Sequence, residues 1–200
     1  MMARPKKANK DEMATVRIEN AFWKLLETES YSDITVLRIS QEAGTNRNSF
    51  YYHYKDVNDL AYSAFINNAS GGATEKLMSM LLSAFQTNSN QPLTNIEPEM
   101  LFHLKRVMLC ASSDSVFLNH LTRDLLRQIW FEALSIDEAV LTPVDNLQIN
   151  FIFSGLTTVL GCPEINASPL LMSSLSQTEV GKASVAALKT IALRQSNAKS

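Results

Sequence analysis

The stretch that decides the fold covers residues 35–56 and has the sequence TVLRISQEAGTNRNSFYYHYKD. Within it, Val36, Ile39 and Ala43 fall three and four positions apart, which places them on one stripe of a helix. Thr35 stands directly before this stripe, where its hydroxyl can accept a hydrogen bond from a free backbone N–H. We therefore predict a short amphipathic helix that begins after Thr35.

A second short helix is predicted after Gly44, because glycine commonly ends a helix in a left-handed conformation. Phe50 and Tyr54 lie four positions apart and form its buried side. Its outer face has amides, a guanidinium, hydroxyls and an amine but no carboxylate, from Asn46, Arg47, Asn48, Ser49, Tyr52 and Lys55. Two short helices joined by a glycine turn indicate a helix-turn-helix, whose second helix enters the major groove of DNA. The alternative is an ordinary amphipathic helix pair with a polar outer face.

The same stretch resembles the DNA-binding signature of TetR/AcrR-type transcriptional regulators. In that family a threonine opens the second helix, Ala-Gly closes it, and an aromatic run followed by lysine ends the recognition helix. The resemblance covers residues 12–66, and its matching positions are Thr35, Ala43, Gly44, the run from Phe50 to Lys55, Asp56, Asp59 and Leu60. Two positions depart from the family pattern, since Asn48 replaces a small residue and Thr45 replaces valine. These departures leave the target DNA sequence open.

The resemblance implies an all-α chain in two parts. A three-helix helix-turn-helix head occupies residues 1–66, with a basic mobile tail at residues 1–10, and a helical effector-binding and dimerisation domain occupies residues 67–200. The implied function is transcriptional repression by a homodimer that binds a palindromic DNA operator and is released by a small effector. The alternative is a TetR-like coregulator that acts through a protein partner. We expect no enzyme activity, because no catalytic constellation is evident.

The residues expected to bind DNA divide into two groups. Near the helix ends, the hydroxyl, imidazole and ammonium groups of Thr35, Tyr51, His53 and Lys55 suit phosphate contacts. At the start of the recognition helix, base edges are within reach of Thr45, Asn46, Arg47, Asn48 and Ser49, with Tyr52 two residues past Phe50. Arg47 is our first choice for reading guanine, although it can also bind a phosphate.

The composition of the chain limits which partners and which cellular compartment we expect. The 200 residues have a net charge of −2, which argues against a uniformly basic surface that would bind nucleic acid everywhere. Arg4, Lys6, Lys7 and Lys10 form a basic tail that either lies along DNA or is a solvated, disordered end. The chain has only two cysteines, and no apolar run is long enough to span a bilayer, so we expect a cytoplasmic protein without a membrane partner.

Apolar periodicity predicts further helices across the rest of the chain. Their expected ranges are 11–29, a helix from Asp56, 73–86, 99–111, 116–134 and 145–160, with a loop between Gln86 and Pro98. The last helix is expected to begin at Ser176, where Ser176 and Glu179 have the spacing of a capping box and Leu175 and Val180 that of a hydrophobic staple.

The last two helices have small residues that permit close helix packing, among them Ser154, Gly155, Thr158, Gly181 and Ala187. Such a helix pair resembles the four-helix dimer interface of TetR-type proteins. Close packing within one subunit is the alternative.

The resemblance also implies an apolar effector cavity in the body. Its expected lining is Phe102, His103, Met108, Phe117 and Trp130, although residues at helical spacing also form ordinary cores. We expect no metal and no cofactor, because the sequence has neither a glycine-rich phosphate loop nor a His or Cys pair at metal-binding spacing.

Overall fold

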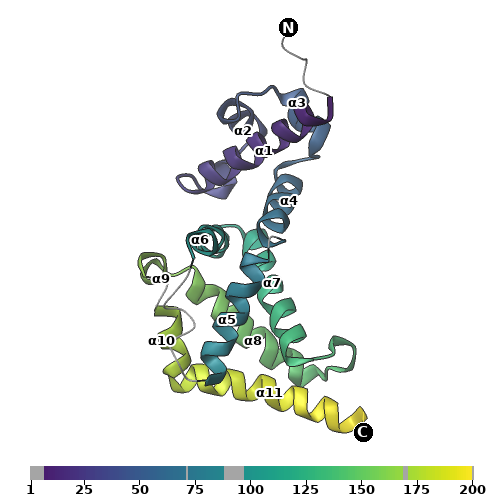
Figure 1. Cartoon of the computed structure of the whole chain (residues 1–200), viewed down its shortest axis with the longest axis vertical. Coiled ribbons are helices and arrows are strands. Elements are labelled where there is room, and N and C mark those ends of the chain that lie inside the picture. Colours follow the sequence, from purple (N-terminus) through teal and green to yellow (C-terminus); the bar gives the residue numbers. More distant parts are fainter. Residues whose placement is uncertain (1–6, 71, 88–96, 169–170, 200) are drawn as a thin grey trace.

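The computed structural model describes residues 7–70, 72–87, 97–168 and 171–199 of the chain. Within these residues the regular structure consists of helices, without strands, so the all-α prediction is confirmed for this part of the chain (Figure 1). No helix among them is long and apolar enough to cross a membrane.

The N-terminal helices form one end of the molecule, which we call the head (Figure 1). It consists of α1 (Lys7–Leu26), the 3₁₀ helix η1 (Tyr31–Asp33), α2 (Val36–Glu42), α3 (Arg47–His53) and α4 (Val57–Ala69). As predicted, the Thr35 hydroxyl caps α2 by accepting a hydrogen bond from the Arg38 N–H. Gly44 has a positive φ of 60°, which lets the chain turn sharply between α2 and α3.

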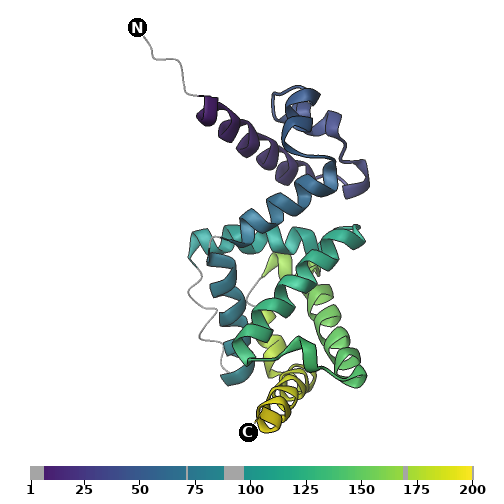
Figure 2. The same cartoon turned by 90° about the vertical axis from the view of Figure 1, so that its right-hand side faces the viewer.

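The remaining helices form the body, and α11 lies at its far end from the head (Figures 1 and 2). They are α5 (Ala73–Thr87), α6 (Pro98–Ser112), α7 (Val116–Leu134), the 3₁₀ helix η3 (Glu138–Val140), α8 (Pro143–Leu160), α9 (Pro163–Ala167), α10 (Leu171–Gln177) and α11 (Glu179–Lys199). The range predicted for α7 is confirmed, and those for α5, α6 and α8 agree within two residues.

Helix α6 lies between head and body. Its residues Met100, Leu104 and Met108 lie in the apolar core of the body, together with Trp130. Cys110 of the same helix instead joins the apolar core of the head. Side chains on different faces of α6 therefore belong to two cores.

Two expectations about helix ends are wrong. Helix α1 begins at Lys7, so residues 7–10 of the predicted mobile tail are helical, while residues 1–6 lie outside the described residues. Ser176 does not cap the last helix, because it is buried within α10. The hydroxyl of Thr178 instead accepts a hydrogen bond from the Gly181 N–H at 3.1 Å. Several side chains of similar capping ability precede this helix, and tertiary packing selects among them.

Helix α11 is fixed to the start of α8 by an ion pair. The carboxylate of Asp145, which also completes a capping box with Thr142, bonds Arg194 of α11. One residue later, Gln195 exchanges two hydrogen bonds with the Asp137 backbone, at 2.8 and 2.9 Å. The hydrogen bonds from Arg194 and Thr142 lower the pKa of Asp145 to about 2, although burial opposes this shift.

This depressed pKa predicts an acid-sensitive contribution to stability. Because the folded value lies below the ordinary 3.8, the contribution is complete above about pH 4 and is lost as the pH falls through about 2. Asp145→Asn should lower the free energy of unfolding by about 1–3 kcal/mol at neutral pH, and by less as the pH approaches 2. Denaturant unfolding from pH 7 to pH 2 measures this difference. Glu179→Gln, at a carboxylate 93% exposed, is the control that should change little. An equal loss at every pH would show that the charge of Asp145 contributes nothing.

Candidate nucleic-acid interface

Helix α3 is short, and its first turn is held by its own cap. The side-chain oxygen of Asn46 accepts a hydrogen bond from the Ser49 N–H at 2.8 Å. This bond satisfies one of the free N–H groups of the first turn, as expected of an asparagine N-cap. The amide NH₂ of Asn46 keeps its two donors for another partner.

Helix α3 turns one side into the head and leaves the other exposed. Phe50 is fully buried in the head core, where Tyr54 joins it after the helix ends. Tyr51 and Tyr52 are 58% and 71% exposed, so two large aromatic side chains face solvent beside each other. Arg47 and Asn48 are also exposed. The predicted burial of Phe50 and Tyr54 is confirmed. The predicted exposure of Arg47, Asn48 and Tyr52 is confirmed as well.

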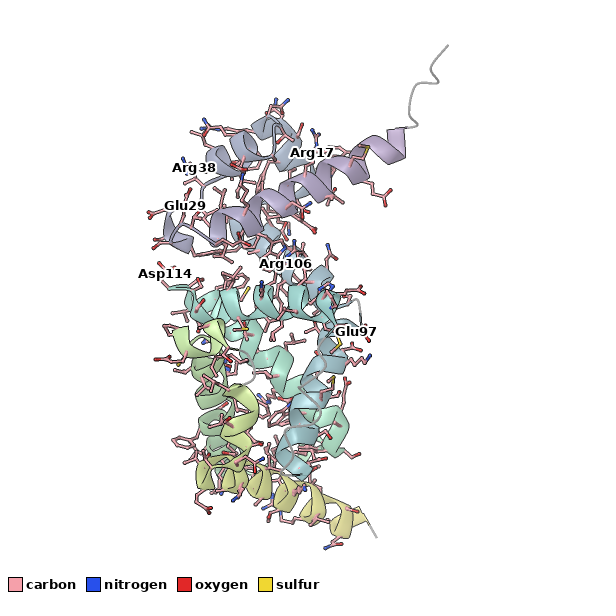
Figure 3. All side chains as sticks on the ribbon, turned by 60° about the vertical axis from the view of Figure 1, so that its left-hand side comes forward. Arg17, Glu29, Arg38, Glu97, Arg106 and Asp114 are labelled. Carbon is pink, nitrogen blue, oxygen red and sulfur yellow. The ribbon has the colours of Figure 1, made fainter. Side chains whose placement is uncertain are left out.

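The ion pairs of the head involve cations of α1 and α2 and leave Arg47 of α3 and Lys55 just after it unpaired within the described residues. Lys24 of α1 pairs with Glu42, and Arg38 of α2 pairs with Glu29, as Figure 3 shows for the labelled Arg38 and Glu29 at one edge of the head. Within the described residues, neither Arg47 nor Lys55 makes an ion pair. Helix α3 itself contains no carboxylate. An anionic ligand at this face therefore meets positive charge that the described part of the chain leaves unneutralised.

The chain just after α3 is fixed by hydrogen bonds from both sides. The Lys55 N–H donates to the Asp59 carboxylate at 2.9 Å, and Asp56 caps α4 through the Asp59 N–H, also at 2.9 Å. The Tyr54 hydroxyl donates to Glu19 of α1 at 3.1 Å. Burial, followed by the nearby Glu19 charge, raises the pKa of Tyr54 well above its usual value, so this hydroxyl stays a donor. The ammonium group of Lys55 thus extends from a well-anchored backbone.

The threonines expected at the interface differ in accessibility. The Thr35 hydroxyl accepts a hydrogen bond from the Arg38 N–H at 3.3 Å and still has its own hydrogen to donate. The Thr45 hydroxyl is buried and has no hydrogen-bond partner within the described part of the chain. Thr45 can therefore meet DNA only through its methyl group or backbone. Ser49 and His53 are half-buried at the edge of α3, and the His53 ring packs edge-on against Tyr52.

The five residues expected to line an effector cavity lie in different environments. Met108 and Trp130 are fully buried in the body core, whereas Phe117 packs against the head core. Phe102 is 52% exposed, and His103 bonds Asn68 of α4. The structure therefore does not bring these five side chains together as one apolar lining.

The surface of the body has an apolar groove that the sequence analysis did not predict. Helices α8 and α11 enclose about 550 Å³ between Phe151, Gly155, Val180, Ser184 and their neighbours. Along α8, the exposed side chains of Val144, Leu147 and Phe151 follow at helical spacing, and Phe151 is 79% exposed. The apolar residues at these positions were visible in the sequence. Their exposure was not, because the same spacing is typical of a helix that faces its own core.

A scan against models of known protein families finds none that matches this chain. A search of curated proteins finds no matching relative either.

The cap on α3 gives a stability prediction that does not depend on DNA. Asn46→Ala removes the acceptor for the Ser49 N–H and should lower the free energy of unfolding by about 0.5–2 kcal/mol. Asn46→Ser, which keeps a capping oxygen, should recover most of this loss. Denaturant unfolding of the three proteins measures the effect. Equal stability of Asn46→Ala and the unmodified chain would contradict the capping role.

Proposed function

We propose that this chain is a TetR-type DNA-binding transcriptional regulator, a repressor that binds a palindromic operator as a homodimer and is released by a small effector. The observation that carries the proposal is the exposed face of α3. It has no carboxylate, its aromatic rings face solvent, and Arg47 and Lys55 make no ion pair within the described residues. These are the groups that bind phosphates and base edges.

Within this proposal the residues of α3 have separate roles. Arg47 binds guanine O6 and N7, because a guanidinium offers two parallel donors. Reading adenine through N6 and N7 requires an amide that both accepts and donates. The oxygen of Asn46 is already engaged by the Ser49 N–H, so the exposed Asn48 is the better amide for this contact. Tyr52 packs against a thymine methyl group or bonds a phosphate.

The phosphate contacts come from the ends of the two helices. The Thr35 hydroxyl keeps a free hydrogen, and Tyr51, His53 and Lys55 lie at or just after the end of α3. Such contacts fix the register of the head on the duplex without selecting a sequence.

The exposed groove on the body supports the homodimer. Large apolar side chains on the surface of α8 favour association, since burying them removes apolar area from water. A second copy of the same face is the occupant that we propose, because the proposed function requires two heads related by a two-fold axis to read one pseudo-palindrome. A small effector that binds better to a state with mis-spaced heads then lowers operator affinity.

Two substitutions on the head test the division between base and phosphate contacts. Arg47→Ala should cost about 1–3 kcal/mol on the cognate duplex and relax the preference at one base pair of each half-site. Lys55→Ala should weaken binding to all duplexes alike and reduce the salt dependence. Binding-site selection followed by fluorescence anisotropy at several salt concentrations measures both effects. An unchanged consensus for Arg47→Ala, with uniformly weaker binding, would make Arg47 a phosphate contact instead.

Gly155 offers a clean test of the dimer. A Cβ atom built at this position meets no other atom within 4 Å, so a larger side chain fits in the single subunit. Gly155→Arg should therefore leave the fold intact but separate two packed α8 faces, and sedimentation should show monomers with weaker operator binding. Ala187 is a poorer probe because it packs partly against the body core. Ser32→Arg, at an exposed position of the head, is the control. A fully dimeric Gly155→Arg protein would place the interface elsewhere.

A further inference from the structure

Glu19 of α1 lies where three helices of the head meet. Its carboxylate oxygen accepts a hydrogen bond from the Tyr54 hydroxyl at 3.1 Å and another from the Asn67 amide at 2.7 Å. Tyr54 ends the recognition helix α3, and Asn67 belongs to α4. One side chain of α1 thus holds both the end of α3 and the helix that follows it.

The neighbouring turn of α1 is held by the body. Arg106 of α6 places its guanidinium carbon 4.9 Å from the ring centre of Trp23 and 4.2 Å from that of Phe102. The same guanidinium donates a hydrogen bond to Asn20 at 3.3 Å. Figure 3 shows the labelled Arg106 where α6 faces α1, between head and body. Arg106 therefore connects α6 to the residue that directly follows Glu19.

Charge adds to these contacts. Burial lowers the pKa of Arg106, and the negative charge of Glu19 opposes this shift. The nearby charge of Glu27 opposes the shift in the same way. The two side chains attract each other across the joint between α1 and α6.

Helix α6 is also fixed in the body, since Leu104 and Met108 lie in the body core. A separate link joins α6 to α4, where Asn68 donates to the His103 backbone oxygen at 3.2 Å and its own oxygen lies 2.8 Å from His103 Nδ1. Besides the packing of Cys110 in the head core, α6 thus has a hydrogen-bonded connection to α4 and another, through α1, to the end of α3.

We propose that Glu19 is a positioning residue that couples the body helix α6 to the C-terminal end of the recognition helix, because it bonds Tyr54 and directly precedes Asn20, the residue of α1 that Arg106 bonds. A displacement of α6 changes the Arg106 contacts with α1, and Glu19 passes the change to Tyr54 and the adjoining Lys55. The consequence for DNA binding rests on the proposed function, whereas the coupling itself is a property of the free protein.

A double-mutant cycle followed by hydrogen exchange of the full chain tests the coupling. Arg106→Met removes the charge and the donors but keeps an apolar stem, and Tyr54→Phe removes one hydroxyl. We expect Arg106→Met to speed exchange of the amides of residues 50–55 about fivefold, the size expected for one lost hydrogen bond. The exchange of amides in α8, a body helix outside these contacts, is the reference against which the effect is measured. In the Tyr54→Phe background, Arg106→Met should add nothing further.

Tyr31→Phe is the matched control, because the Tyr31 hydroxyl also donates to a side chain in the head, Asn58, at 2.5 Å but lies outside these contacts. In that background the full effect of Arg106→Met should remain. Additive effects of Arg106→Met and Tyr54→Phe, or an effect limited to α1 and α6, would overturn the proposal. If Arg106→Met fails to fold, the same cycle with Arg106→Lys decides, because lysine keeps the charge but loses the planar donor.

A second measurement separates this proposal from the proposed function. With a duplex obtained by binding-site selection, Tyr54→Phe should weaken binding several-fold while Tyr31→Phe leaves it unchanged. Equal effects of both variants would overturn the role of Glu19 in DNA binding. If the unmodified chain selects no duplex, the proposed function fails, and the exchange cycle still decides whether α6 and α3 are coupled.

Discussion

The structure depends on the burial of α6 between two apolar cores. Leu104 and Met108 belong to the body core and Cys110 to the head core, so the helix cannot leave either without exposing apolar area. The burial of Cys110 also raises the pKa of its thiol far above the ordinary value, so this cysteine acts as packing. Head and body are consequently packed against each other through α6, although the sequence pattern and the ribbon views (Figures 1 and 2) suggest two separate parts.

This packing explains how a helix as short as α3 can have a defined position. An isolated helix of its length is unstable in water, so its order comes from tertiary contacts and caps. Asn46 holds its start, Phe50 its buried side and Tyr54 its end, each with a partner in the head. The remaining side is exposed and cationic, and an ordered cationic face is what DNA recognition requires.

The head was predictable from sequence because its features depend on neighbouring residues. The body was less predictable because packing between distant residues decides which side chains are buried and which cap a helix. The Thr35 cap, the positive φ of Gly44 and the burial of Phe50 each follow from a residue type and its near neighbours. The expected cap at Ser176 failed because packing buries that residue and Thr178 caps instead. Likewise, the hydrogen-bond partner of His103 is Asn68, 35 positions earlier in the chain, and the sequence alone did not predict this pair.

In the function that we propose, two copies of this chain place two α3 helices on one DNA duplex. Sedimentation of the full chain with a duplex obtained by binding-site selection tests it most directly. We expect a dimer in the absence of DNA, one dimer per selected duplex, and a pseudo-palindromic consensus with half-sites about 34–36 Å apart. A chain that remains monomeric and enriches no duplex over a random pool would contradict it.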